Sequence, residues 1–284
     1  MNYQHAFHAG NFADVHKHIV LTRILMHLRQ KPAAFRVIDS HAGAGRYDLL
    51  SAEASRGAEW QRGIGRLLSG MVRLPDACRD LLAPYLDAVA AFNPAGALHT
   101  YPGSPLIAQS LLRPADRLIA CELEPKSAAL LASALRGDRR AKALAIDGWT
   151  AIGAYVPPKE RRGVVLADPP FEDRDDFSRL AEMLVAAHRK WSTGIFALWY
   201  PIKVRDAPDA LARRLGRSGI AKILRSELTI GRSGPDLGLA GSGLVVVNPP
   251  HTLEPELRVL LPALAAILAI EPRSGVSRLD WISR

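Results

Sequence analysis

Seven short apolar runs rich in β-branched residues, most of them separated by helix-like stretches, constrain the fold of this chain more than any other feature. The runs occupy residues 35–45, 117–125, 142–148, 163–171, 194–201, 222–230 and 242–250. Runs of this length are typical of strands buried on both faces. Segments 126–135 and 176–190 between them predict helices, the second with apolar residues at helical spacing. Because strands and helices alternate, the sequence predicts an α/β fold with helices on both faces of the sheet.

One interval breaks this alternation. Residues 52–97 show helical segments with glycine and proline punctuation and no strand signal. Since a connection between a strand and a helix is normally short, we expect 52–97 to form a small inserted helical subdomain. The main domain then comprises residues 1–51 and 98–284. Residues 231–243 hold five glycines and predict a mobile loop near the sheet.

The chain is basic, with 37 lysines and arginines against 28 aspartates and glutamates in 284 residues, a formal net charge of +9. The excess is spread through folded segments, and its largest shares fall in residues 1–50 and 201–284. A basic face on the folded protein suits nucleic acid, but an ordinary solvated surface can carry the same excess of positive charge. Charge alone also gives no specificity for a base sequence. If nucleic acid binds, we expect these two blocks to flank the reactive pocket and hold phosphates.

Composition excludes several classes of protein. Apolar residues make up 48% of the chain, enough for a large core, which excludes general disorder. The longest apolar run, residues 259–270, contains Pro262 and is well short of the roughly 20 residues that span a bilayer. The N-terminus has no apolar segment after a basic start, so we expect no signal peptide and a cytoplasmic protein. Cys78 and Cys121 lack the paired spacing of disulfide frameworks or zinc sites.

The turn after the first predicted strand, from Asp39 to Gly45, is rich in glycine. Such a turn, with Gly43 at its centre, lets a ligand approach the backbone closely. An NAD fingerprint needs a third glycine where Asp48 stands and an acid about 20 residues later, so a strict NAD interpretation fails. Glu122, which ends the second predicted strand, can instead accept hydrogen bonds from both ribose hydroxyls of an adenosine-containing cofactor.

Asp147 and Gly148 end the third predicted strand. Ligands of open α/β sheets bind at the carboxyl ends of the strands, where Asp147 would meet the amino group of an adenine. The alternative role for Asp147 is the N-cap of the following helix. Ser104, in the YPGSP segment that closes the insertion, would lie beside the cofactor or belong to an ordinary turn before a helix.

The most specific motif is DPPF, from Asp168 to Phe171, at the end of the fourth predicted strand. Proline lacks an N–H, so the Asp168 carboxylate and the Pro169 carbonyl can both accept from one exocyclic amine while Phe171 stacks on a base. These acceptors favour methyl transfer to an amine conjugated with an aromatic ring, and a base must leave its stack to reach them. The alternative is a Pro-Pro turn capped by Asp168. We interpret a second copy, NPPH at 248–251, as structural.

The N-terminal region is rich in histidine: His5, His8, His16 and His18 precede His41. Neutral imidazole is a common zinc ligand, but no nearby carboxylate pair or cysteine completes a site, so we expect no metal. We expect Lys17 and His18, on a helix that begins near Asp14, to face the cofactor or the substrate. Tyr3 would stack on a nucleotide or pack against the fold.

Several segments form one pattern: Tyr3, FHAGNFADVHKH at 7–18, DSHAGAGRY at 39–47, YPGSP at 101–105, ELEP at 122–125, DG at 147–148 and DPPF at 168–171. Together they resemble the bacterial 23S ribosomal RNA adenine-N6 methyltransferase J family over nearly the full length. The resemblance implies an S-adenosyl-L-methionine-dependent enzyme with a Rossmann-like class I methyltransferase sheet. It also implies methylation of the N6 amine of one adenine in 23S rRNA, adenine 2030 in the usual rRNA numbering.

With Gly43 of the glycine turn, the resemblance places the cofactor against His18, His41, Ser104, Glu122, Asp147, Gly148 and Asp168. It makes Asp168 the catalytic acceptor with Pro169 and Phe171 beside it, puts Lys17 near the active site and makes Tyr3 a substrate contact. Phe171 stands where the family often has tyrosine, which keeps stacking and loses any hydroxyl contact. The implied partner is 23S rRNA free of ribosomal proteins, and we expect a monomer that needs no metal and no membrane.

Three other functions stay open at this point. DNA adenine-N6 methylation would use the same chemistry on another nucleic acid. An NAD(P)-dependent oxidoreductase would use the glycine turn, but it conflicts with Asp48 and with the long gap to Glu122. A nonenzymatic RNA-binding scaffold would not need the Asp168 carboxylate.

Overall fold

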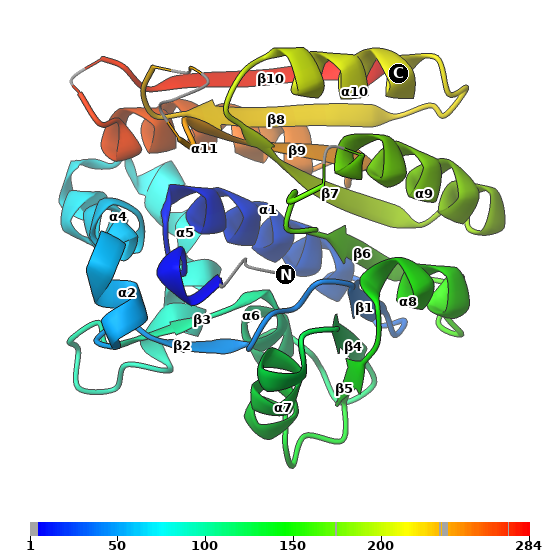
Figure 1. Ribbon diagram of the computed structural model, residues 1–284, viewed down its shortest axis with the longest axis horizontal. Helices are drawn as coiled ribbons and strands as arrows, with labels where there is room; N and C mark the ends of the chain where they lie inside the picture. Colours follow the sequence, from blue (N-terminus) through cyan, green and yellow to red (C-terminus); the bar gives the residue numbers. More distant parts are fainter. Residues whose placement is uncertain (1–4, 174, 233, 235–237, 272) are drawn as a thin grey trace.

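The computed structural model describes residues 5–173, 175–232, 234, 238–271 and 273–284. Its main sheet is built from β1 (Arg36–Asp39), β4 (Arg117–Glu122), β5 (Ala141–Ala145), β6 (Gly163–Ala167), β7 (Ile195–Ile202), β8 (Ile223–Thr229), β9 (Gly241–Val247) and β10 (Val276–Ser283). The spatial order is β10-β8-β9-β7-β6-β1-β4-β5 (Figure 1). From β5 to β7 all neighbours are parallel, whereas β9 is antiparallel to both β7 and β8, and β10 is antiparallel to β8. This arrangement confirms the predicted Rossmann-like α/β sheet.

Helices cover both faces of the sheet (Figure 1). One face carries α1 (Phe12–Arg29), α6 (Ser104–Ser110), α7 (Pro125–Ala134) and α11 (Leu253–Leu268), and the other carries α8 (Gly148–Tyr155), α9 (Asp176–Lys190) and α10 (Asp206–Gly216). The two cores follow the period-two alternation of the strands, because Val37 packs in the first core and Ile38 in the second. Burial on both faces explains why the central strands are nearly continuous apolar runs.

The insertion leaves the sheet after β1 and returns before α6. Its two ends pair as a short antiparallel ribbon, β2 (Arg46–Asp48) with β3 (Thr100–Pro102). The helical body comprises α2 (Ala52–Gly57), α3 (Glu59–Arg62), α4 (Ile64–Gly70), a 3₁₀ turn η2 (Met71–Arg73) and α5 (Asp76–Ala90). Leu67 and Tyr85 of this body share a core with residues of α1 and α11. Residues 52–97 are therefore largely helical. That they form a subdomain separate from the main domain stays a prediction.

The first long helix starts earlier than predicted. The Asn11 side-chain oxygen accepts hydrogen bonds from the backbone N–H groups of Ala13 (2.9 Å) and Asp14 (3.0 Å), so α1 begins at Phe12 rather than near Asp14. A 3₁₀ turn, η1 (His5–Phe7), precedes it and packs against α2. Capping by Asn11 satisfies backbone donors that the first helical turn leaves without partners.

Three strand features depart from the predictions. The edge strand β10 was not predicted, because its apolar residues alternate with polar ones and most of it is partly exposed. The run at 242–250, the last that the sequence predicts, ends with β9 at Val247, and NPPH follows it. The Asn248 amide donates to the carbonyls of Ser192 and Gly194, both at 2.8 Å. Residues 241–243 of the glycine-rich segment belong to β9, and residues 233 and 235–237 lie outside the described residues.

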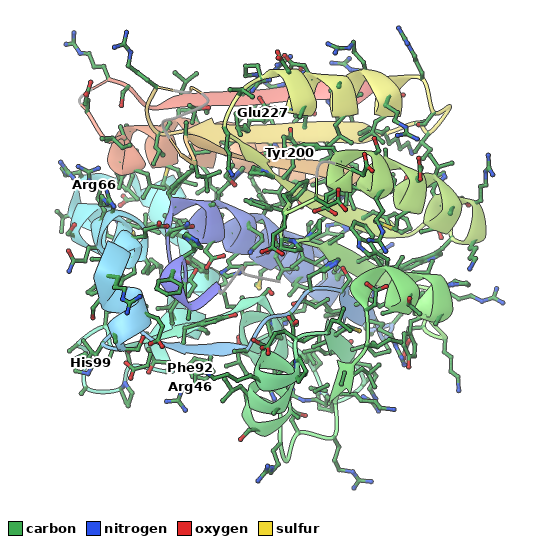
Figure 2. All side chains as sticks on the ribbon, viewed as in Figure 1. Arg46, Arg66, Phe92, His99, Tyr200 and Glu227 are labelled. Carbon is green, nitrogen blue, oxygen red and sulfur yellow. The ribbon has the colours of Figure 1, made fainter. Side chains whose placement is uncertain are left out.

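A buried carboxylate ties the antiparallel part of the sheet to α10. Glu227 on β8 is 2% exposed and accepts from the Tyr200 hydroxyl (2.8 Å) and from Arg205 (2.7 Å). Figure 2 shows Tyr200 and Glu227 in this upper part of the molecule, with Arg66 of the insertion on the left. Because a buried charge is costly unless it is paired, these contacts hold Glu227 in place.

We predict that Gly63→Ala destabilises the contact between the insertion and the N-terminal segment. A Cβ at Gly63 would stand 2.1 Å from the Gly10 carbonyl oxygen, which also accepts from the Ile64 N–H at 2.9 Å. The free energy of unfolding in urea should fall by roughly 2–3 kcal/mol. Gly153→Ala in α8 is the control, since a Cβ there meets nothing within 4 Å and should stabilise by about 0.5–1 kcal/mol. Wild-type stability for Gly63→Ala would contradict this contact.

Candidate active site

The carboxyl ends of β1, β4, β5 and β6 open into a cavity of about 280 Å³, called the first cavity. Open α/β sheets bind their ligands at this edge. The residues of the sequence prediction that line it are Lys17, His18, His41, Gly43, Ser104, Glu122, Asp147, Gly148 and Asp168. The fold thus brings together positions as far apart as Lys17 and Asp168, which are 151 residues apart in the chain.

Glu122 joins two of the turns that form the first cavity. Its Oε2 accepts from the Gly43 N–H at 2.9 Å, and its Oε1 accepts from the Glu124 N–H at 2.8 Å. Gly43 has a φ of 61°, a left-handed conformation that glycine adopts without strain. Each carboxylate oxygen can accept a second hydrogen bond, so Glu122 has capacity left for the hydroxyls of a ligand.

Asp147 caps α8, which was its alternative role in the sequence. Its Oδ2 accepts from both the N–H and the hydroxyl of Thr150 at 2.8 Å, while the residue also lines the first cavity. Gly148 follows where no side chain fits, because a Cβ would stand 2.2 Å from the Ser40 carbonyl oxygen. The cap leaves Oδ1 of Asp147 for a ligand, so the two roles are compatible.

His41 and Trp149 form an aromatic wall of the first cavity. Their ring centroids are 5.2 Å apart in an edge-to-face arrangement, and the Ser40 hydroxyl lies 2.8 Å from His41 Nδ1. Desolvation lowers the pKa of His41 to about 4, so the ring is neutral at physiological pH. His18 is buried and lies 2.8 Å from the Tyr101 hydroxyl through Nδ1. His41 therefore presents a neutral ring to the first cavity, and His18 presents a ring that is hydrogen-bonded to Tyr101. Both can orient a ligand through their ring nitrogens.

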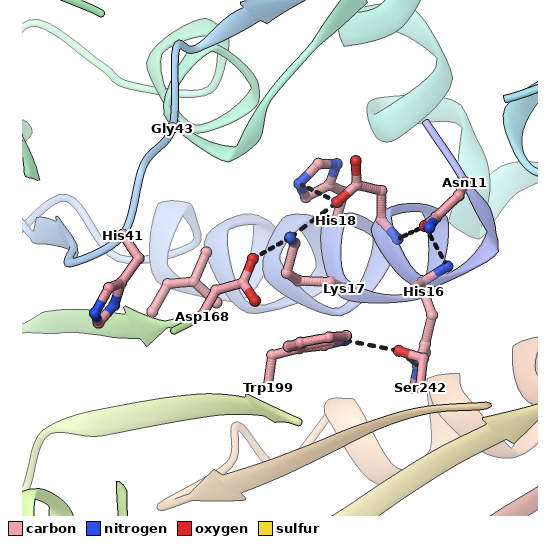
Figure 3. Close-up of polar contacts among 12 residues, drawn as sticks. Asn11, His16, Lys17, His18, His41, Gly43, Asp168, Trp199 and Ser242 are labelled. Carbon is pink, nitrogen blue, oxygen red and sulfur yellow. Dashed lines mark hydrogen bonds and ion pairs between the residues drawn. The ribbon is translucent and has the colours of Figure 1, made fainter. Parts of the chain in front are cut away.

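The Lys17 ammonium lies between two carboxylates. It contacts Asp14 Oδ1 at 2.9 Å and forms a short ion pair with Asp168 Oδ2, and its side chain is only 4% exposed. Burial disfavours the charge, but the two carboxylates outweigh it and raise the pKa of Lys17 above its ordinary value. Figure 3 shows Lys17 pointing from α1 toward Asp168, with His41 on the other side of Asp168. One oxygen of Asp168 is thus fixed by Lys17.

A second cavity of about 700 Å³ adjoins the first. Lys17, Asp168, Pro170 and Glu172 line both cavities, so the two meet at the DPPF turn. Phe171 and Trp199 line the second cavity, and their ring centroids are 5.7 Å apart. Phe171 has a φ of 52°, a conformation that a bulky residue seldom adopts, and such strain is concentrated at functional sites.

Asp39 is a buried carboxylate at the end of β1, only 1% exposed. Neither of its oxygens has a hydrogen-bond partner of good geometry among the described residues, although the Ser104 side chain is near. Desolvation raises the pKa of Asp39 to about 7, against the lowering effects of Ser104 and Lys17. Asp39 directly precedes Ser40 and His41, which line the first cavity. A buried carboxylate at this position, without well-aligned hydrogen-bond partners in the described part of the chain, is suited to meet a cationic ligand group.

Four residues that line these cavities were not among the predicted site residues: Asp14, Glu59, Trp149 and Trp199. Asp39 was not predicted either, and it lies buried behind Ser40 of the first cavity. Trp149 directly follows Asp147-Gly148, so its position next to a strand end was a usable signal. Glu59 belongs to α3 of the insertion and reaches the second cavity, where the His8 ring nitrogen Nδ1 lies 3.0 Å from its carboxylate. No local pattern in the sequence relates Glu59 to Asp168.

Other predicted features have mixed outcomes. Pro169 is buried and is not among the lining residues of either cavity, and Tyr3 lies outside the described residues. Within the part of the chain that the structure describes, no group of three or more histidine, cysteine or acidic side chains is arranged to hold a metal. In the same described part, no helix is long and apolar enough to cross a membrane.

The expected flanking of the pocket by basic residues is met only in part. Lys17 and Lys203 line the second cavity. Arg36, however, lies at the amino end of β1, and Arg29 lies at the opposite end of α1, roughly 18 Å along the helix from Lys17. These two positive charges of residues 1–50 are therefore remote from Asp168, which follows the carboxyl end of β6.

The sheet, with its reversed strand β9, and a cavity at its carboxyl edge beside the DPPF turn define a class I methyltransferase of the Rossmann-like type. A family model described as "Ribosomal RNA large subunit methyltransferase D, RlmJ" matches residues 32–283. The chain belongs to this RlmJ family of ribosomal RNA large subunit methyltransferases.

Individual relatives agree with this assignment. "Ribosomal RNA large subunit methyltransferase J" of Haemophilus influenzae is 39% identical over 284 residues, covering 100% of this chain and 99% of the relative. The protein of the same name from Escherichia coli is 39% identical over 282 residues, covering 99% of each. A crystal structure of a Legionella pneumophila protein described as family-model DUF519 has a TM-score of 0.87 and 31% identity, covering 96% of this chain and 98% of that one.

We predict that Asp39 makes stability fall as the pH rises. Its folded pKa of about 7 lies above the unfolded value of 3.8, so the folded state holds the extra proton between these values. The stability advantage of Asp39→Asn over wild type should therefore grow by roughly 2–3 kcal/mol from pH 5 to pH 8. Urea unfolding of the ligand-free protein at both pH values measures it. Asp80→Asn, which removes an exposed carboxylate of α5, controls for charge, and an equal advantage of Asp39→Asn at both pH values would contradict the prediction.

Proposed function

We propose that this chain methylates the N6 amine of a single adenine, adenine 2030, in 23S rRNA, with S-adenosyl-L-methionine as the methyl donor. The observation that carries the proposal is the meeting of two cavities at Asp168. A methyl transfer needs its donor and acceptor in line and in contact, and two adjoining cavities allow each ligand its own site.

The first cavity suits the donor. Bound S-adenosyl-L-methionine supplies an electrophilic methyl group, and its ammonium, ribose and adenine need acceptors and a flat wall. The buried Asp39 carboxylate and the remaining capacity of Glu122 supply acceptors for the ammonium and the ribose, and Trp149 supplies an aromatic wall. We assign the remaining contacts to the residues that the sequence suggested: His18, His41, Gly43, Ser104, Asp147, Gly148 and Asp168.

The second cavity suits the acceptor base. Asp168 accepts a hydrogen bond from the N6 amine and the Pro169 carbonyl accepts the other, which draws the nitrogen toward tetrahedral geometry and frees its lone pair. Lys17 holds Oδ2 of Asp168 in place, so the carboxylate does not have to reorganise as positive charge develops on the nitrogen. Phe171 stacks on the base, and Tyr3 contacts the substrate.

The adenine must leave its stack to reach the DPPF turn, at a cost of a few kcal/mol that stacking on Phe171 offsets in part. This access is available in naked rRNA, and we assign 23S rRNA free of ribosomal proteins as the substrate. The enzyme acts as a monomer in the cytoplasm and uses no metal. Lys203 beside the second cavity supplies one contact for an RNA phosphate.

We predict that wild-type protein transfers labelled methyl from S-adenosyl-L-methionine to one adenine of protein-free 23S rRNA. Asp168→Ala should lower kcat/KM by about 10³-fold, at the upper end of the roughly 10²–10³-fold lost when one preorganised electrostatic contact is removed. Nuclease digestion and chromatography identify the labelled nucleoside as N6-methyladenosine. Asp206→Asn, which removes an exposed carboxylate at the start of α10, is the control and should retain full activity.

Two of the rival functions give different results in this assay. Preferential labelling of duplex DNA over rRNA in competition would identify a DNA adenine methyltransferase. Absence of labelling, or full labelling by Asp168→Ala, would refute the proposed reaction, and intact RNA binding by a protein without transfer would indicate a scaffold.

We predict that Glu122→Gln weakens S-adenosylhomocysteine binding. Glutamine has one acceptor oxygen in place of two, and Glu122 already spends one hydrogen bond of each oxygen on backbone N–H groups. The Kd measured by calorimetry should rise about 10-fold, which corresponds to about 1.4 kcal/mol. Wild-type protein should not bind NADPH in the same experiment. Tight NADPH binding, or unchanged affinity of Glu122→Gln with an unaltered melting temperature, would contradict the assigned cofactor site.

A further inference from the structure

A chain of buried hydrogen bonds runs from α1 to the wall of the second cavity. The Trp199 indole N–H donates to the Ser242 hydroxyl at 2.9 Å, and this hydroxyl lies 3.0 Å from His16 Nδ1. His16 Nε2 lies 2.9 Å from the Ser226 hydroxyl. His16, Ser226 and Ser242 are all 0% exposed. This series of hydrogen bonds joins α1 to three adjacent strands, since Trp199, Ser226 and Ser242 belong to β7, β8 and β9, respectively.

The direction of these hydrogen bonds follows from the chemistry of the groups. An indole N–H only donates, so the Ser242 oxygen accepts from Trp199. Burial lowers the pKa of His16 to about 3, and a neutral imidazole has one donor and one acceptor nitrogen. In one consistent arrangement Ser242 donates to His16 Nδ1, and His16 Nε2–H donates to Ser226. His16 is thus neither a metal ligand nor a titrating group at physiological pH.

The other side of the Trp199 ring borders the groups that flank Asp168. Lys17 Nζ lies 5.8 Å from the ring centroid, and the Phe171 ring meets Trp199 at 69°. Consecutive residues of an α-helix point about 100° apart, so α1 directs Lys17 to Asp168 and His16 to Ser242. Figure 3 shows this divergence, with Trp199 reaching Ser242 below Lys17.

We propose that His16 and Ser242 are positioning residues for the reaction, because they fix the Trp199 indole that forms one wall of the second cavity. The fixed ring sets the width of this cavity and keeps Phe171 and the Lys17 ammonium beside Asp168. The inference rests on the proposed function in one respect only, the use of the second cavity by the acceptor base. His16 and Ser242 act through Trp199 and touch neither ligand.

The first experiment observes the indole directly. The chain has five tryptophans, so a ¹H–¹⁵N spectrum contains up to five indole N–H signals, and Trp199→Phe identifies that of Trp199 by its loss. Ser242→Ala should move this signal upfield and speed its exchange with solvent. Ser242→Thr, which keeps the hydroxyl, should restore the wild-type position. Ser110→Ala, which removes an exposed hydroxyl on α6, is the control and should leave the signal in place.

The second experiment is a double-mutant cycle on methyl transfer. Ser242→Ala should lower kcat/KM for rRNA about 10-fold and leave the Kd of S-adenosylhomocysteine within twofold of wild type. Trp199→Phe, which keeps a ring and removes the N–H, should cause a similar loss. In the Trp199→Phe background, Ser242→Ala should cost less than a further twofold, because the hydrogen bond is already absent.

These results separate the inference from the proposed function. An unchanged indole signal in Ser242→Ala, or equal losses from Ser242→Ala in both backgrounds, would overturn the positioning role. A matching rise in the Kd of S-adenosylhomocysteine would also overturn it, because a general loss of structure affects both cavities. A wild-type protein that methylates no rRNA would refute the proposed function, while the indole signal would still decide whether Ser242 fixes Trp199.

Discussion

The reactive end of this molecule depends on the buried ammonium of Lys17. A charge in this position is tolerable only because Asp14 and Asp168 lie on either side of it. The contact joins the start of α1 to the end of β6, two segments that are distant in sequence, and it fixes the carboxylate around which both cavities are arranged. Removing either carboxylate would leave a buried charge only partly compensated, which costs more than the intact pair contributes. The contacts of Lys17 with Asp14 and Asp168 are therefore better understood as a geometric constraint than as a source of stability.

Much of the fold could be predicted because its central strands carry a strong local signal. The runs around Val37, Leu118 and Val164 are apolar on both faces, and no other common element explains such runs with intervening helices. β10 could not be predicted in the same way. It is an edge strand with one neighbour, and its pairing with β8 depends on tertiary contacts that its half-polar sequence does not reveal. The three-residue strands β2 and β3 are too short to give any periodicity.

The residues of the candidate site also divide into those that the sequence predicts and those that it does not. Glu122, Asp147 and Asp168 could be predicted because parallel strands end at one edge of a sheet, so that acids at strand ends converge. Trp199 and Glu59 could not, because they reach the second cavity from β7 and from the insertion, and neither follows a recognisable motif. The sequence raised and rejected a zinc site for the N-terminal histidines, and in the structure these residues lie in different places. His18 lines the first cavity, His8 meets Glu59 in the second, and His16 lies within the core.

The ribbon formed by β2 and β3 has a consequence for how this family can vary. Tyr47 pairs with Tyr101, so the chain leaves and re-enters the main domain at neighbouring points. Once the ends of a loop are held together, each doubling of its length adds only about 0.6 kcal/mol of closure entropy. The helical body beyond the ribbon can therefore lengthen, shorten or be exchanged at little entropic cost to the sheet. The insertion, which reaches the second cavity through Glu59, and the carboxyl edge of the sheet can then evolve at different rates within one chain.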